Sequence, residues 1–120
     1  MESENKSDLR ELTIEFALLV SDNCENIKGC GNYISQITRS SSSIGANLHE
    51  AKSAQSTADF INKLEIALKE SSETEYWLEL IFRKEKITPE QYNTIKKVCG
   101  TIRRKLIASI TTVKRNNNLL

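Results

Sequence analysis

Cations gather in the last part of the chain, at a spacing that suits contact with phosphate groups. Residues 83–120 hold 10 Lys/Arg and 2 Asp/Glu, whereas residues 1–82 hold 7 and 14. On a helix these cations fall on two lines about 100° apart, beside the apolar stripe and not within it. A ridge of this kind suits the backbone of RNA or DNA. The candidate nucleic-acid-binding residues are Lys96, Arg103 and Lys114 on one line and Lys97, Arg104 and Arg115 on the next.

The same cations have a second interpretation. They could form a solvated face, or they could pair with the acidic first and third helical segments of the same or a neighbouring chain. Arg83, Lys84 and Lys86 add charge just before the last helical segment. No aromatic residue is interleaved with the cations, so we expect weak stacking on single strands and binding that is mostly non-specific and salt-sensitive.

Residue types used in catalysis and metal binding are present but not grouped. Glu65, Glu73, Glu75 and Glu79 include i,i+4 spacings, yet no Glu-x-x-His motif follows, which argues against a di-iron bundle. His49 is the single histidine, and there is no Gly-rich phosphate loop. We therefore expect no catalytic residue, no cofactor and no metal site, and the protein is predicted not to be an enzyme. A metal-dependent catalyst is the third hypothesis, and metal analysis of the purified protein would test it.

The cysteines and the hydropathy pattern bear on the compartment. Cys24, Cys30 and Cys99 have no CxxC spacing. A redox pair between Cys24 and Cys30 is one interpretation, and buried or half-buried thiols in a reducing compartment is the one we favour. No apolar run approaches the ~18–20 residues of a membrane span. The polar, acidic N-terminus does not resemble a signal peptide, so we expect a cytoplasmic protein of bacterial type that makes no membrane contact.

Helical periodicity must position all of these residues. Apolar residues recur at three- and four-residue spacing, and no window alternates as a strand does. Gly29 and Gly31 separate the first two helices, Ser56 is the N-cap of the third, and Thr88 with Gln91 forms a capping box on the fourth. Short connections favour antiparallel neighbours. We predict an all-α, up-down-up-down antiparallel four-helix bundle in one domain over residues 1–120, with helices at 7–26, 32–52, 57–84 and 89–115 and a frayed tail at 116–120.

The second helix contains a locally unfavourable run. Ser40–Ser43 is followed by Gly45, and a helical glycine costs about 1 kcal/mol relative to alanine. The apolar seam that includes Ile37 and Ile44 is nevertheless continuous, so we expect the helix to continue through the serines. Ser41 lies on this seam, where a small residue either lets a neighbouring helix approach closely or lets a bulky side chain such as Phe16 or Phe60 fill the gap.

Two helix faces are candidates for contacts. Broadly opposite its apolar seam, the second helix carries a polar stripe, which is either solvated or a contact line against another helix or subunit. On the third helix, a second apolar face indicates a subunit interface; the alternative is that its tryptophan is covered by the first helix or the N-terminal arm. The interface candidates are Arg39, Ser43, Asn47 and Glu50 on the second helix and Ile66, Trp77 and Leu80 on the third.

The middle third of the chain carries a resemblance. The segment 35–80 reads SQITRSSSSIGANLHEAKSAQSTADFINKLEIALKESSETEYWLEL. It resembles the four-helix-bundle family first known from reading frames in intervening sequences of bacterial 23S ribosomal RNA genes, which includes the accessory variability protein of diversity-generating retroelements. Gly45 and Ala51 depart from the family pattern, which often has proline and glycine there. The matching residues are Gln36, Ile37, Arg39, Ser43, Ile44, Asn47, Leu48 and Glu50, then Phe60, Leu64, Ala67 and Ser71 and, less exactly, Glu73 and Glu75.

This resemblance implies a small bundle that has no recognised catalytic residues and that assembles into a ring, typically a homopentamer. The retroelement member partners a reverse transcriptase and binds nucleic acid. We therefore expect a non-catalytic, oligomeric accessory or binding protein that contacts RNA or DNA through its basic fourth helix, with a reverse-transcriptase-like protein as a candidate partner. The alternative is a purely structural homo-oligomer or protein-interaction module whose charges pair between subunits.

Overall fold

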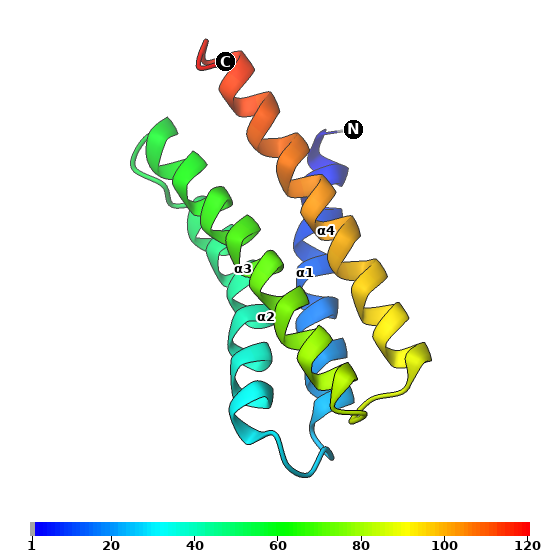
Figure 1. Ribbon diagram of the computed structural model, residues 1–120. Coiled ribbons are helices and arrows are strands. Elements are labelled where there is room, and N and C mark those ends of the chain that lie inside the picture. Colours follow the sequence, from blue (N-terminus) through cyan, green and yellow to red (C-terminus); the bar gives the residue numbers. More distant parts are fainter. Residues whose placement is uncertain (1) are drawn as a thin grey trace.

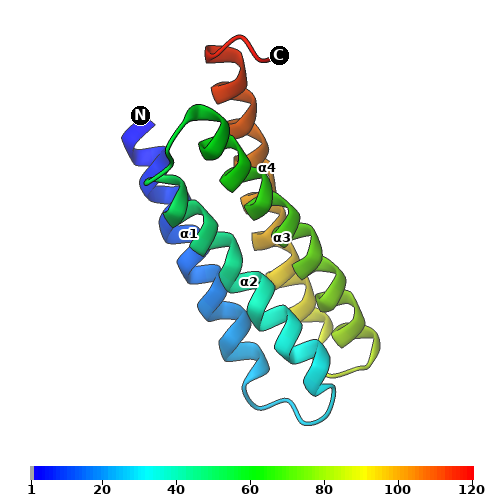
Figure 2. The ribbon, with the colours of Figure 1, turned by 90° about the vertical axis from the view of Figure 1, so that its left-hand side faces the viewer.

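The computed structural model describes the backbone of residues 2–120 and the side chains of residues 9–120. It contains four helices and, over residues 2–120, no strand: α1 (Glu2–Cys24), α2 (Gly31–Ala51), α3 (Thr57–Arg83) and α4 (Pro89–Asn116). The helices alternate in direction, so the α1–α2 and α3–α4 connections lie at one end of the bundle, opposite the two chain ends (Figures 1 and 2). The prediction of an all-α up-down-up-down bundle is confirmed.

The bounds of α1 differ from those expected. The helix begins at Glu2 instead of Ser7 and ends at Cys24 instead of Asn26. It starts earlier because no glycine or proline interrupts residues 2–8. After the helix ends, Gly29 and Cys30 both take left-handed backbone conformations, with φ of 84° and 56°, and these two residues turn the chain into α2.

Side-chain caps fix the starts of α3 and α4. Ser56 Oγ accepts a hydrogen bond from the Asp59 amide at 3.1 Å. Thr88 Oγ1 accepts from the Gln91 amide at 3.0 Å, and Gln91 Oε1 accepts from the Thr88 amide at 2.8 Å, which confirms the predicted capping box. Each such cap stabilises a helix by about 1 kcal/mol.

The core is one apolar column to which all four helices contribute. Each helix contacts its two neighbours in the cycle α1–α2–α3–α4, and the interface of α2 with α3 is the most extensive. Charged outer faces remain on every helix, and none of those described has the length and apolarity that crossing a membrane requires. The fully buried large apolar side chains are Phe16, Val20, Ile37, Ile44, Leu64, Leu78, Ile81, Ile95, Ile102 and Leu106.

The serine run of α2 lies where that helix packs between α1 and α3. Ser40 and Ser41 are fully buried, and Thr74 Oγ1 of α3 donates a hydrogen bond to Ser40 Oγ at 2.9 Å. On the α1 side, a Cβ atom added to Gly45 would lie 3.1 Å from Thr13 Oγ1. Small residues in this stretch therefore allow α2 to approach both neighbours, and the helix continues through the run despite its poor local propensity.

Candidate functional site

The cations on the first predicted line of α4 face α3. Arg103 pairs with Glu75, and Lys114 Nζ lies 3.4 Å from Glu65 Oε2. The Lys96 ammonium group lies 5.4 Å from the centre of the Tyr92 ring, within the range of a cation–π contact. Arg103 and Lys114 thus neutralise carboxylates of their own chain, as the second interpretation of the basic helix expected.

The cations on the second line point away from α3. Lys97, Arg104 and Arg115 are exposed, and no carboxylate among the side chains of residues 9–120 lies within ion-pair distance of them. Arg104 Nη2 donates to Thr101 Oγ1 at 3.2 Å, a bond within the helix. At about 1.5 Å per residue, the line from Lys97 to Arg115 is about 27 Å long. We call these three residues the exposed cation line.

One aromatic side chain lies next to a cation near the start of α4, although none is interleaved with the cations in the sequence. The ring of Tyr92 lies next to Lys96 and stacks on Phe82, with centroids 4.2 Å apart and an interplanar angle of 13°. Across from it on α3, Tyr76 is 58 % exposed. The i,i+4 spacing of Tyr92 and Lys96 was the available sequence signal. A cleft of about 320 Å³ lies here between α3 and α4, lined by Glu75, Tyr76, Leu78, Glu79, Tyr92 and Lys96.

The four α3 glutamates that had been considered as metal ligands are each held in an ion pair. Besides the two pairs with α4, Glu79 lies 2.7 Å from Arg83 on its own helix, and Glu73 pairs with Arg39 of α2. Among the residues that the structure describes, no three His, Cys, Asp or Glu side chains are grouped to hold a metal ion. Three of these pairs therefore join α3 to a neighbouring helix, and the Glu79 pair lies within α3.

The polar stripe of α2 partly contacts α3. Arg39 donates to Glu70 at 2.9 Å and to Glu73 at 2.6 Å, while Glu50 accepts from Lys63 at 3.3 Å. The hydrogen bond from Arg39 lowers the pKa of Glu73, and the same bond raises the pKa of Arg39. Arg39 and Glu50 thus meet another helix of their own chain, and Arg39 remains 47 % exposed in its side chain.

The remaining interface candidates lie in half-buried positions. Asn47 Nδ2 donates to the backbone oxygen and Oγ of Ser43, at 2.9 and 3.1 Å. Trp77 stacks on Tyr33 with centroids 6.0 Å apart, and its indole donates to Glu73 at 3.3 Å. Tyr33 of α2 therefore covers part of Trp77, whereas the side chains of residues 1–8 in the N-terminal arm lie outside the described residues. The other two α3 candidates are also half-buried: Ile66 and Leu80.

Exposed apolar side chains also lie outside the interface predicted from the sequence. Ile14 and Leu18 are 40 % and 58 % exposed on the outer face of α1, where Glu11 and Glu15 flank them. On α4, Ile107 is 47 % exposed. The i,i+4 spacing of Ile14 and Leu18 away from the core stripe of α1 was the signal for this face.

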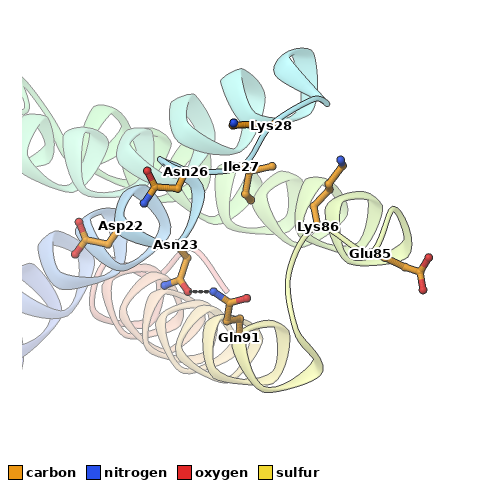
Figure 3. Close-up of a pocket in the computed structure, with 8 residues that line it drawn as sticks. All are labelled: Asp22, Asn23, Asn26, Ile27, Lys28, Glu85, Lys86 and Gln91. Atoms are coloured by element: carbon orange, nitrogen blue, oxygen red, sulfur yellow. Dashed lines mark hydrogen bonds between the residues drawn. The ribbon is translucent and has the colours of Figure 1, made fainter.

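A polar cleft of about 680 Å³ lies where the α1–α2 and α3–α4 connections meet (Figure 3). Gln91 donates to Asn23 across it at 2.8 Å, and the Glu85 carboxylate points away from this pair. Two cations and two carboxylates line the cleft, so its charge favours neither an anion nor a cation. The lining residues are Asp22, Asn23, Asn26, Ile27, Lys28, Glu85, Lys86 and Gln91.

Each of the three cysteines, all in the described part of the chain, is a free thiol. Cys99 is buried and donates to the Ser71 backbone oxygen at 3.4 Å, and burial raises its pKa to about 12. Burial also raises the pKa of Cys24, whereas Cys30 is half-buried before α2. Buried thiols of raised pKa are unreactive at neutral pH, which agrees with the interpretation favoured from the sequence.

The chain is similar in sequence and in fold to known proteins of one kind. The profile of a family described as 23S rRNA-intervening sequence protein matches residues 6–108. A crystal structure described as a protein with unknown function from the S23 ribosomal protein family of Bacteroides thetaiotaomicron VPI-5482 has 45 % identity and a TM-score of 0.83, and the match covers 89 % of this chain and 98 % of that one. Comparison with curated proteins gives no significant match. The resemblance noted over residues 35–80 thus extends over most of the chain.

Proposed function

The chain belongs to the 23S rRNA-intervening sequence protein family, and from this premise we propose that it is a non-catalytic, oligomeric binding protein that contacts RNA or DNA through α4. The exposed cation line carries this proposal. Lys97, Arg104 and Arg115 lie along one face of α4 with no carboxylate partner among residues 9–120. When unpaired cations of this kind bind a phosphate backbone, they release its counterions, and this release favours binding.

The chemistry of the other side chains supports a binding role. The glutamates of α3 are engaged in ion pairs, and the buried Cys99 thiol has a pKa of about 12, so both are poorly suited to act as bases or nucleophiles. Free thiols suit the reducing cytoplasm, which is the compartment we propose. The family resemblance adds a homopentameric ring and a reverse-transcriptase-like protein as the candidate partner.

The charge and apolar pattern also supports self-association. The outer face of α1 is acidic around Ile14 and Leu18, whereas Ile107 of α4 lies beside cations. These faces are complementary, so α1 of one subunit could pack on α4 of the next, and repetition of such a contact closes a ring. The half-buried Ile66, Trp77 and Leu80 of α3 remain candidates for the same role.

This complementarity favours a second candidate function, a purely structural homo-oligomer. In that case the exposed cation line would pair with the α1 carboxylates of a neighbouring subunit and would not be free for phosphates. The two candidates therefore predict different consequences for the same substitution on α4.

Arg104→Glu tests both candidate functions. Lys69→Glu is the matched control, because Lys69 is an exposed cation on the outer face of α3. Binding of a generic RNA is measured by fluorescence anisotropy across a salt series, and solution mass by light scattering. We expect Arg104→Glu to weaken binding at least about tenfold with the mass unchanged, and Lys69→Glu to change neither.

The logarithmic salt slope of the wild type should be about −2 per subunit for three contacts on a single strand. Loss of assembly in Arg104→Glu supports the structural candidate, and a wild type that does not bind RNA at low salt contradicts the binding function.

A further inference from the structure

We propose that the cleft between α3 and α4 is a stacking site for one base of a single-stranded nucleic acid, with Tyr76 as the platform and Lys96 as the group that meets the adjacent phosphate. This inference rests on the proposed function and adds how the strand is recognised. The cleft lies near the α3–α4 connection, where these two helices run side by side (Figures 1 and 2). Its volume of about 320 Å³ lies at the small end of the roughly 300–1,000 Å³ range of ligand sites.

Each of the two aromatic side chains of the cleft packs against another aromatic ring. Tyr92 is stacked on Phe82 at 4.2 Å. Tyr76 meets the Trp77 ring edge-on at 5.2 Å and 69°, and Trp77 stacks in turn on Tyr33 of α2. Tyr76 nevertheless keeps 58 % of its surface exposed. A ring that is already fixed loses little conformational freedom when a base stacks on it, which favours binding.

Of the charged residues that line the cleft, only Lys96 has no charged partner among residues 9–120. The two carboxylates of the cleft are neutralised, because Glu75 pairs with Arg103 and Glu79 lies 2.7 Å from Arg83. Lys96 has only its contact with the Tyr92 ring, and no carboxylate among residues 9–120 lies within ion-pair distance of it. The net charge that remains is therefore positive and is placed beside two aromatic rings. This combination of a cation with stacking platforms is typical of sites for single-stranded nucleic acid.

The cleft and the exposed cation line lie on neighbouring faces of α4, about 100° apart around the helix. Lys96, at the edge of the cleft, is the neighbour in sequence of Lys97, the first residue of that line. A strand whose phosphates follow Lys97 and Arg104 along α4 would have a base within reach of Tyr76. Phosphate contacts then position the strand, and the cleft distinguishes a strand with bases from one without.

The test compares a short thymidine oligonucleotide with an abasic oligonucleotide of the same length, which carries the same phosphates without the bases. Fluorescence anisotropy at low salt gives the affinity of the full chain for each. We expect the wild type to bind the strand with bases about tenfold more tightly than the abasic strand, which corresponds to the stacking of one base. Tyr76→Ala should remove this difference while leaving the affinity for the abasic strand unchanged, and Tyr76→Phe should retain it.

The fluorescence of Trp77 provides a second readout. It is the single tryptophan of the chain and touches the Tyr76 ring. Its emission should change when the strand with bases binds and stay constant with the abasic strand. Free thymidine monophosphate should bind far more weakly than the strand because it lacks contacts with the cation line; equal affinity would overturn the assignment to a strand.

The outcomes separate this inference from the proposed function. If the wild type binds both strands equally, or if Tyr76→Ala weakens both equally, the stacking site is overturned and the exposed cation line stands. If the wild type binds neither strand at low salt, both proposals are overturned. Loss of the base-dependent tenfold difference in Tyr76→Ala alone, with Tyr76→Phe like the wild type, supports both.

Discussion

Thr74 of α3 donates a hydrogen bond to Ser40 of α2 in the centre of the bundle, with 2.9 Å between the two hydroxyl oxygens. Both side chains are fully buried. Thr74 Oγ1 also lies 2.8 Å from the Glu70 backbone oxygen, whereas the other contact of Ser40, with the Ile37 backbone oxygen, is long at 3.4 Å. A buried hydroxyl is costly without a partner, so α3 supplies what makes the serine run of α2 acceptable.

Removing this hydrogen bond should destabilise the bundle. Thr74→Val keeps the shape of the side chain but leaves Ser40 poorly satisfied, and we expect a loss of about 1–2 kcal/mol in the free energy of unfolding. Ser40→Ala in the same protein should then cost less than it does alone, because the two residues are coupled. Urea denaturation of the two single variants and the double variant measures this. The control is Ser42→Ala on the exposed face of α2, which should change stability by less than about 0.5 kcal/mol; additive effects of Ser40 and Thr74 would contradict the coupling.

Gly45 should resist replacement by alanine although it lies within a helix. Alanine would gain about 1 kcal/mol in helix propensity, but its Cβ would lie 3.1 Å from Thr13 Oγ1. That hydroxyl is held by a 2.8 Å hydrogen bond to the Arg10 backbone oxygen, so it cannot easily move. Because overpacking costs about 1–3 kcal/mol, we expect Gly45→Ala to be neutral to destabilising in thermal denaturation.

The effect of Gly45→Ala on stability should change sign once the Thr13 hydroxyl is removed. In a Thr13→Ala background, Gly45→Ala should stabilise the protein, since the nearest hydroxyl is gone and the gain in propensity remains. Gly31→Ala is the control, because a Cβ at Gly31 would meet nothing within 4 Å. A Gly45→Ala variant that is more stable than the wild type without the Thr13 change would show that α1 and α2 pack more loosely than described.

The features that follow from local sequence were predictable. Helical periodicity located the four helices, and the capping box of Thr88 and Gln91 was read from residue types alone, because both effects act within one turn. The pairing of side chains between helices was not predictable in this way. Arg103 and Arg104 are neighbours in sequence, yet one faces Glu75 and the other faces solvent. That difference depends on the rotation of α4 against α3, which is fixed by packing of the whole core.

The ring that packs on Trp77 was not predictable from the sequence for the same reason. Periodicity placed this residue off the core stripe of α3, and the sequence allowed either a subunit interface or a cover from the first helix or the N-terminal arm. The packing of α2 against α3 brings Tyr33 onto the indole, with centroids 6.0 Å apart. No local pattern links residues on two separate helices in this way, so Tyr33 could be assigned only from the fold.

The pair of Arg39 with Glu73 should make the protein sensitive to acid. The hydrogen bond from Arg39 holds the pKa of Glu73 below its usual value of 4.5, so the folded state binds fewer protons than the unfolded state near that pH. The stabilisation is therefore complete above the ordinary glutamate pKa and is lost as the pH falls through the folded value. Because both side chains are partly exposed, we expect a contribution below about 1 kcal/mol.

Arg39→Gln should flatten the decline in stability between about pH 5 and pH 3. Urea denaturation at several pH values measures this slope. Lys52→Gln, at the residue that follows α2, is the control, because it removes one exposed cation and should leave the slope as in the wild type. An equal slope in all three proteins would show that Arg39 does not shift the titration of Glu73.

The three thiols should differ sharply in reactivity. Cys30 is half-buried, whereas Cys24 and Cys99 are buried and burial raises their pKa values, that of Cys99 to about 12. At mildly alkaline pH we expect iodoacetamide to label Cys30 first and the other two at least about 100-fold more slowly, because their alkylation requires opening of the helices. Mass spectrometry of native protein follows the labelling. Cys30→Ser should lack the rapid phase, unfolded protein should show three reactive thiols, and rapid labelling of Cys99 in folded protein would contradict its burial.

The division of the α4 cations into paired and free sets can be tested by exchanging charges between helices. Arg103→Glu would place a carboxylate against Glu75, so we expect a loss of about 1–2 kcal/mol in stability from the broken pair and the new repulsion. Combining it with Glu75→Arg should restore most of that loss and keep RNA binding, because the exposed cation line is intact. Arg104→Glu should instead weaken RNA binding and leave stability within about 0.5 kcal/mol. If Arg103→Glu were as stable as the wild type and lost RNA binding to the same extent as Arg104→Glu, both arginines would face the ligand and the distinction between the two lines would be wrong.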